Sequence, residues 1–132
     1  IGKANLVQEG DDLTLIAWGA MVKTCTDAIE KLNNKYSIEF IDLRTISPYD
    51  AEAVIASVKK TGRCVITHEA IRTCGFAAEL IASINEKALL SLYAPVVRVT
   101  SPDVPLPLAK LESYFLPDVN RVINGIEKVM GF

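Results

Sequence analysis

Short runs of apolar and β-branched residues alternate along this chain with longer segments of helical periodicity. Strands separated by helices of about ten to fifteen residues require crossover connections, which are right-handed and give a mostly parallel sheet. The alternation therefore predicts an α/β fold of three layers, α/β/α, with helices on both faces of the sheet. The predicted strands cover residues 4–8, 13–17, 38–43, 64–67 and 95–100, and the predicted helices cover 20–31, 47–61, 75–88, 110–115 and 118–130.

Two turn signals refine this pattern. The sequence Glu-Gly-Asp-Asp at residues 9–12 lies between the first two predicted strands, and the residues alone predict that these strands pair as a hairpin across it. Ser47 is of a type that caps helices and Pro48 of a type that fits the first helical position, so we expect the second helix to begin there.

Length, charge and composition limit the class of protein. A chain of 132 residues is long enough for a core of its own, and we expect residues 1–132 to form one domain. The net charge of -2 gives no basic footprint for nucleic acid, and no stretch is apolar enough to cross a membrane. Because the chain starts at Ile1 and not at Met, we expect a fragment or a processed product of a longer protein.

The three cysteines do not form a recognisable metal or disulfide framework. Cys25 falls on the apolar stripe of a predicted helix and Cys64 within a predicted strand, and their spacing with Cys74 matches no zinc pattern. We expect three reduced thiols in an intracellular protein. Cys74 precedes a predicted helix start, so redox sensing is a second interpretation of that residue beside an incidental small side chain.

The candidate site lies where the fourth predicted strand ends. His68, the only histidine, follows that strand together with Glu69 and Arg72. Ligands and partners of open α/β sheets usually meet the carboxyl edge of the strands. His68 is either a proton carrier or substrate contact, or a polar residue hydrogen-bonded at the strand end. Glu69 and Arg72 are expected to form an ion pair across the turn, and Trp18 is either core filling or an interface anchor.

Several separate motifs, in the same order along the chain, resemble one family. They resemble the carboxyl-terminal domain of the β subunit of thiamine-diphosphate-dependent 2-oxo acid dehydrogenases, which act on pyruvate or on branched-chain 2-oxo acids such as 2-oxoisovalerate. The same type of domain forms the carboxyl-terminal end of transketolases. The motifs lie at residues 42–50, 63–76, 94–99, 101–105 and 116–118.

The resemblance implies a particular sheet. It would be a five-stranded mixed sheet in the order 1-3-2-4-5 with the first strand antiparallel, and this conflicts with the hairpin suggested by residues 9–12. We expect the order implied by the resemblance. The carboxyl ends of the second and fourth strands would then be neighbours, and Trp18 and Gly19 would line one crevice with His68 and Glu69.

The resemblance also implies a function for the whole enzyme. That enzyme would decarboxylate a 2-oxo acid on thiamine diphosphate with magnesium and transfer the acyl group to a lipoyl group. In the family the cofactor lies between the α subunit and the amino-terminal domain of the β subunit. This chain has no phosphate-binding glycine motif and no acidic cluster. We therefore expect no catalytic, cofactor-binding or metal-binding residue here, and no binding of thiamine diphosphate by the isolated chain.

The implied roles of this domain are subunit assembly and docking. The expected partners are the α subunit, a second β subunit and the subunit-binding domain of the dihydrolipoyl acyltransferase, in the bacterial cytoplasm or the mitochondrial matrix. In some members that subunit-binding domain sits near the chain ends, so Phe132 and its carboxylate join Trp18, His68, Glu69 and Arg72 as candidate partner-binding residues. The alternatives are a free-standing flavodoxin-like binding module, or the same domain of a transketolase-type enzyme. The sequence leaves the choice of 2-oxo acid open.

Overall fold

The computed structural model describes all residues of the chain, 1–132, and contains one five-stranded sheet in the order β1-β3-β2-β4-β5. β1 runs antiparallel to β3, and every other neighbouring pair is parallel. The order implied by the resemblance is confirmed, and the hairpin suggested by residues 9–12 is wrong. The strands are β1 (Asn5–Gln8), β2 (Leu13–Ala17), β3 (Ile38–Asp42), β4 (Cys64–Ile71) and β5 (Val97–Ser101).

The turn at residues 9–12 reverses the chain without pairing β1 with β2, because its polar groups bind the residue that precedes β3. The backbone N–H groups of Asp11 and Asp12 both donate to the carbonyl oxygen of Ser37, at 3.1 Å and 2.8 Å. The Asp12 carboxylate in turn accepts from the Ser37 N–H at 2.8 Å. These contacts hold β2 beside β3, and β1 pairs with the other edge of β3.

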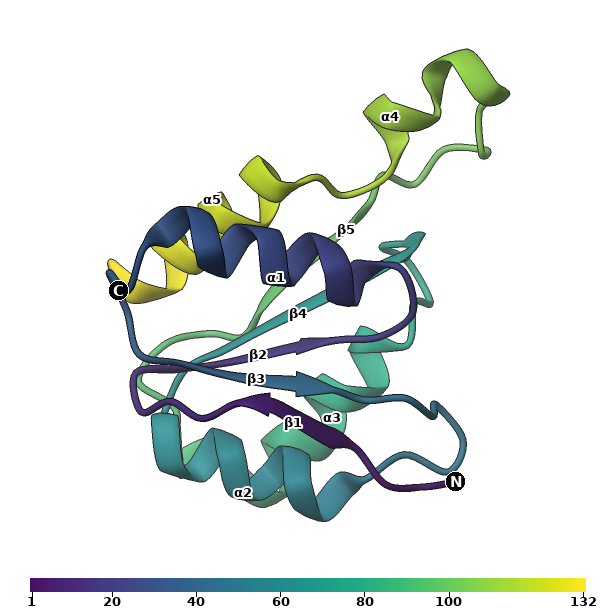
Figure 1. Cartoon of the computed structure of the whole chain (residues 1–132). Helices are drawn as coiled ribbons and strands as arrows, with labels where there is room; N and C mark the ends of the chain where they lie inside the picture. The colour runs from purple at the N-terminus through teal and green to yellow at the C-terminus, as the bar shows by residue number, and fades with distance from the viewer.

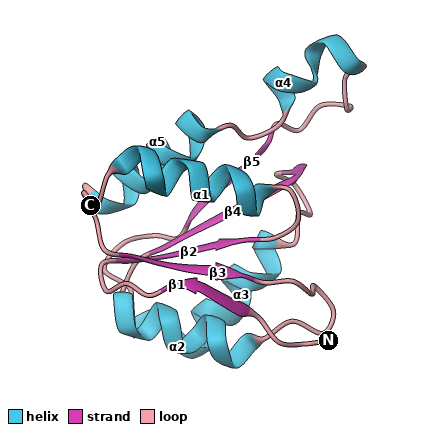
Figure 2. Cartoon of the chain, in the orientation of Figure 1, coloured by secondary structure: helices cyan, strands magenta, loops and turns pink.

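Two helices cover each face of the sheet, as Figures 1 and 2 show, so the three-layer architecture is confirmed. α1 packs against α5 on one face, and α2 packs against α3 on the other. Each face has its own apolar cluster of buried residues. The helices are α1 (Met21–Leu32), α2 (Ala51–Thr61), α3 (Ala77–Ala88), α4 (Glu112–Phe115) and α5 (Val119–Met130), with 3-10 turns η1 (Leu89–Ser91) and η2 (Ala109–Leu111).

The start of α2 differs from the sequence-based expectation. Ser47 and Pro48 lie in a bend before the helix, and Asp50 is the capping residue. One Asp50 carboxylate oxygen accepts from the Ala53 N–H at 3.2 Å, and the other accepts from the Ala4 N–H at 3.1 Å. Burial raises the pKa of this carboxyl, but the two N–H donors and Lys3 outweigh it and hold the pKa below its ordinary value. Asp50 therefore fixes both the helix start and the chain entering β1.

β4 is longer than the sequence predicted. It continues through His68 and Glu69 to Ile71, with an irregularity in its pairing with β5 between Thr67 and Ile71. His68 and Glu69 are thus strand residues and do not lie in a loop. Gly75 follows, and a Cβ atom there would lie 2.6 Å from Cε1 of His68, so only glycine lets the chain pass this ring. α3 begins at Ala77, two residues later than Gly75.

Gly10 offers a test of the β2–β3 arrangement. A Cβ atom at this position would lie 2.2 Å from the Ile38 carbonyl carbon and 2.4 Å from the Glu39 nitrogen, both backbone atoms. We expect Gly10→Ala to lower the free energy of unfolding by about 1–3 kcal/mol, because the strand backbone must move. Urea denaturation measures the change.

Gly131→Ala is the control for that experiment. Its added Cβ would meet only the Glu127 carbonyl oxygen at 3.3 Å, at the exposed end of α5. We expect Gly131→Ala to stay within about 0.5 kcal/mol of the unsubstituted chain. Equal effects of the two substitutions would show that the turn does not hold β2 in place.

Candidate functional site

The carboxyl ends of β2 and β4 are neighbours, as expected, but aromatic rings fill the space between them and leave no crevice. Ala17 pairs with Thr67, so the next residue of each strand, Trp18 and His68, are neighbours. Their ring centroids lie 5.4 Å apart at an interplanar angle of 23°, which is a stacked arrangement. Phe76 meets Trp18 edge-on at 5.7 Å. Trp18 is half-buried by these contacts and packs against the apolar cluster on the α2 and α3 face.

His68 is held as a buried, neutral ring. Its side chain is fully buried, and neither ring nitrogen has a hydrogen-bond partner. Burial lowers the pKa of His68; an interaction with the Ala70 backbone that falls short of hydrogen-bond geometry opposes the shift, and the charge of Arg98 adds to it. The hydrogen bond expected of a polar residue at a strand end is absent, and no acid or base lies within hydrogen-bond reach for proton transfer.

The expected ion pair between Glu69 and Arg72 does not form. β4 continues as a strand past Glu69, and side chains three positions apart in an extended segment point to opposite faces. Both side chains are exposed, and each lines a different cavity: Arg72 a basic one and Glu69 an apolar one. These two cavities flank the end of β4.

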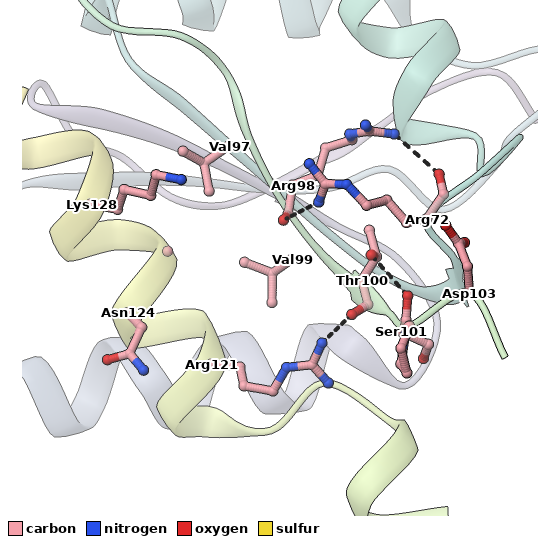
Figure 3. A pocket seen from close by; sticks show the side chains of 12 residues that line it. Arg72, Val97, Arg98, Val99, Thr100, Ser101, Asp103, Arg121, Asn124 and Lys128 are labelled. Carbon is pink, nitrogen blue, oxygen red and sulfur yellow. Dashed lines mark hydrogen bonds between the residues drawn. The ribbon is translucent and has the colours of Figure 1, made fainter. Parts of the chain in front are cut away.

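The basic cavity lies between the end of β4, the strand β5 and the helix α5, and has a volume of about 400 Å³ (Figure 3). Four cationic side chains line it: Arg72, Arg98, Arg121 and Lys128. No ion pair in the chain involves any of the four. The remaining polar lining is Thr100, Ser101, Asp103 and Asn124.

The apolar groove lies between the end of β4 and a segment that leaves the body of the molecule after β5. This projecting segment, residues 102–116, contains η2 and α4 and stands away from the sheet before the chain returns to α5 (Figure 1). The groove has a volume of about 910 Å³. Its carboxylates are Glu69, Asp103 and Glu112, and no lysine or arginine lines it.

The projecting segment exposes a row of large apolar side chains that the sequence analysis did not single out. They are Val104, Leu106, Leu108, Leu111 and Tyr114, with Leu108 90% and Tyr114 81% exposed. The signal was present in the sequence, because apolar residues occupy alternate positions 104, 106 and 108 between prolines. An exposed apolar row of this length is typical of a surface that another protein covers.

The carboxyl terminus lies beside the basic cavity. Val122, Ile126 and Val129 are fully buried, which confirms the expected stripe of α5. Phe132 projects beyond the helix and is 74% exposed. It borders a smaller recess of about 250 Å³ that shares Lys128 with the basic cavity.

The cysteines are all free. Cys25 and Cys64 are buried, and Cys74 is exposed. Burial raises the pKa of the Cys25 thiol to about 12 and that of the Cys64 thiol further still, so both remain protonated. No group of three or more His, Cys, Asp or Glu side chains is arranged to hold a metal ion.

None of the helices combines the length and the apolar character that a membrane span requires.

The fold and the site define an α/β domain with a basic cavity and an apolar groove at its carboxyl edge, and comparison with known proteins identifies its family. The family model for the transketolase C-terminal domain matches residues 2–122. The chain belongs to this family.

The curated relatives are subunits of larger enzymes. The chain is 47% identical over 132 residues to "2-oxoisovalerate dehydrogenase subunit beta, mitochondrial" of Dictyostelium discoideum, covering 98% of this chain and 35% of that protein. It is 44% identical over 133 residues to "Pyruvate dehydrogenase E1 component subunit beta" of Bacillus subtilis, covering 100% of this chain and 41% of that protein. The chain thus spans about two fifths or less of the length of these relatives.

Solved structures with low sequence identity share the fold. A chain of a structure described as "Split gene transketolase, inactive beta4 tetramer" superposes with a TM-score of 0.85 at 23% identity, covering 98% of this chain and 42% of that chain. A 2-oxoglutarate:ferredoxin oxidoreductase from Magnetococcus marinus superposes with a TM-score of 0.64 at 10% identity. The match covers 97% of this chain and 19% of that chain. Both likenesses concern the fold alone.

The state of His68 can be measured directly, because it is the only histidine. We expect its titration midpoint to lie below the ordinary value of about 6.5, since burial favours the neutral ring. The stability that this ring contributes is then fully present above about pH 6.5 and is lost as the pH falls through the folded-state pKa. Two-dimensional NMR of the imidazole nitrogens gives the midpoint. A midpoint at or above 6.5 would contradict the buried, neutral ring.

Proposed function

We propose that residues 1–132 form one domain, the carboxyl-terminal domain of the β subunit of a 2-oxo acid dehydrogenase. The support is identity of 43–47% over nearly the whole chain to β subunits of pyruvate and 2-oxoisovalerate dehydrogenases. These relatives favour an enzyme component over a free-standing flavodoxin-like module. The whole enzyme is then an oxidoreductase that decarboxylates a 2-oxo acid and passes the acyl group to a lipoyl group.

Thiamine diphosphate and magnesium belong to that whole enzyme under this proposal. No three acidic, histidine or cysteine side chains converge, so the chain offers no cluster that would hold a metal ion by itself. Magnesium requires carboxylates or other oxygen ligands in near-octahedral geometry. We therefore assign no catalytic step to this domain and place the cofactor in the remaining part of the enzyme.

The role of this domain under the proposal is subunit assembly, and the projecting segment is the observation that carries it. Its exposed apolar residues contribute little to the core of this chain, because they stand away from the sheet. Covering them with an α subunit or a second β subunit would remove a large apolar area from water. The prolines of the segment limit its freedom before binding, which reduces the entropy lost on assembly.

Docking of the acyltransferase is the second proposed role. Phe132 offers an exposed aromatic ring and the terminal carboxylate on one residue. A basic side chain of the subunit-binding domain of the acyltransferase would pair with that carboxylate. Trp18, His68, Glu69 and Arg72 remain secondary candidates, although the burial of His68 leaves little of it for a partner. The relatives are consistent with a location in the mitochondrial matrix or the bacterial cytoplasm.

The proposed function is tested on the protein from its native source. Intact mass spectrometry and identification of copurifying chains should give a longer β subunit together with an α subunit. Decarboxylation of pyruvate and of 2-oxoisovalerate by that preparation, with and without thiamine diphosphate, then identifies the substrate. A free product of this length without partners or activity would refute the proposal.

Leu108 tests the role of the projecting segment in assembly. We expect Leu108→Ser in the complete β subunit to reduce assembly with the α subunit, because it removes an exposed apolar side chain from the proposed interface. Analytical ultracentrifugation measures the assembled fraction. The thermal stability of the 132-residue chain should not change, since Leu108 is 90% exposed.

Leu90→Ser is the matched control, because Leu90 is 100% exposed but lies in η1. It should leave assembly intact. Equal losses for Leu90→Ser and Leu108→Ser would mean that general surface hydrophobicity, and not the projecting segment, governs assembly.

Deleting Gly131 and Phe132 tests docking. We expect the unfolding free energy to stay nearly constant, because both residues are exposed beyond the end of α5. The affinity of the assembled enzyme for the subunit-binding domain should fall by roughly 1–3 kcal/mol, as expected for a charge-assisted contact. Calorimetric titration measures it. If affinity is retained after deletion, docking uses another surface.

A further inference from the structure

The four cations of the basic cavity come from separate parts of the chain, and Arg98 points away from α5 towards the Arg72 carbonyl group (Figure 3). Arg72 directly follows β4, Arg98 belongs to β5, and Arg121 and Lys128 lie two turns apart on α5 (Figure 3). Four like charges around one concavity repel each other, and this repulsion lowers the stability of the fold. The Asp103 carboxylate reduces this repulsion through its interaction with Arg72, but no ion pair involves any of the four cations, so folding alone does not explain the arrangement.

The guanidinium groups are held in place by backbone carbonyl groups. Nη1 of Arg98 donates to the Arg72 carbonyl oxygen at 3.1 Å, and Nη1 of Arg72 points to the Arg98 carbonyl oxygen at 3.5 Å. Arg121 donates to the carbonyl oxygens of Thr100 and Phe115. Each guanidinium has five N–H donors, so most donors of the three arginines stay unused. These positively charged donors are therefore pre-organised around the cavity.

The rest of the lining favours a small anion. Only two of the twelve lining residues are hydrophobic, so most of the side chains around the cavity are charged or polar. Asp103 is the only acid, and its carboxylate already accepts from the backbone N–H and the hydroxyl of Thr73, at 2.8 Å and 2.7 Å. The Ser101 hydroxyl in the cavity wall is buried without a partner, which leaves one more unused donor.

A simpler explanation of these cationic side chains is that they protect the edge of the sheet from pairing with other chains. β5 is an edge strand, and charged side chains on an edge strand discourage pairing with other chains. That role requires only charges that point to solvent. It does not require two arginines that bind each other's carbonyl groups, nor two further cations supplied by α5.

We propose that the basic cavity binds a small phosphate-bearing anion. Arginine guanidinium groups match phosphate oxygens with paired N–H donors, and a volume of about 400 Å³ accommodates one or two phosphate groups. No divalent cation is needed, because Arg72, Arg121 and Lys128 supply positive charge to the cavity. The proposal does not rest on the assembly or docking roles, although Arg72 is also one of the secondary docking candidates.

NMR titration of the 132-residue chain tests the proposal. The probes are inorganic phosphate and inorganic pyrophosphate, each added at constant ionic strength in the presence of EDTA. We expect saturable shifts of backbone amides at residues 98–103 and 121–128. Stronger binding of pyrophosphate would indicate a two-phosphate ligand, and equal binding would indicate a single phosphate group. The absence of saturation by either probe would overturn the proposal.

Charge-neutralising variants identify the site. We expect Arg72→Gln and Lys128→Gln each to weaken binding about tenfold, and Lys128→Gln is the safer variant because Lys128 makes no side-chain hydrogen bond in the fold. Lys59→Gln is the control, since it removes the same charge from an exposed position on α2, on the opposite face of the sheet. Equal weakening by Lys59→Gln would show a general charge effect and overturn the site.

Discussion

The structure depends on the burial of β2 at the centre of the sheet. All five of its residues are buried, and they alternate between the two cores. Leu13, Leu15 and Ala17 pack beneath α1 and α5, whereas Ile16 packs beneath α2 and α3. Thr14 also points to this second side, and its hydroxyl lies 2.7 Å from Ser57 Oγ and 2.8 Å from Thr61 Oγ1. A buried hydroxyl with two partners fixes α2 on the sheet at one position.

The central position of β2 also determines what lies at the carboxyl edge. Because β2 and β4 are parallel neighbours, Trp18 must meet His68, and the stacked rings close the crevice that the strand order would otherwise open. The exposed charged side chains of this edge therefore lie away from β2, at the end of β4 and on β5. The basic cavity and the apolar groove lie on the two sides of that region, with opposite charge.

The sequence predicted the regular features of the fold, because periodicity reports burial directly. It predicted the helix stripes, including the Val122, Ile126 and Val129 face, and the number of strands. It did not predict the partner of β1 without the family resemblance, since the choice between hairpin and crossover depends on where Asp11 and Asp12 find acceptors. The cap of α2 was misplaced for a similar reason: Asp50 also binds Ala4, which is distant in sequence.

The candidate site was less predictable than the fold. The ion pair between Glu69 and Arg72 was expected from a turn, but the strand continues and separates the two side chains. The basic cavity combines residues from the end of β4, from β5 and from α5, so no spacing within one segment of the sequence predicts it. Arg98 and Lys128 are unremarkable within their own segments, and only the packing of α5 beside β5 brings them together.

The projecting segment has a consequence for the chain before it meets its partners. Val104, Leu106 and Leu108 present apolar side chains at alternate positions of a proline-rich stretch that extends from the body. Chaperones and proteases recognise such sequences in unassembled proteins, because the same surface signals an incomplete fold. If the proposed assembly is correct, the amount of this chain that persists in a cell would depend on the supply of the protein that covers the segment, because excess copies would be removed.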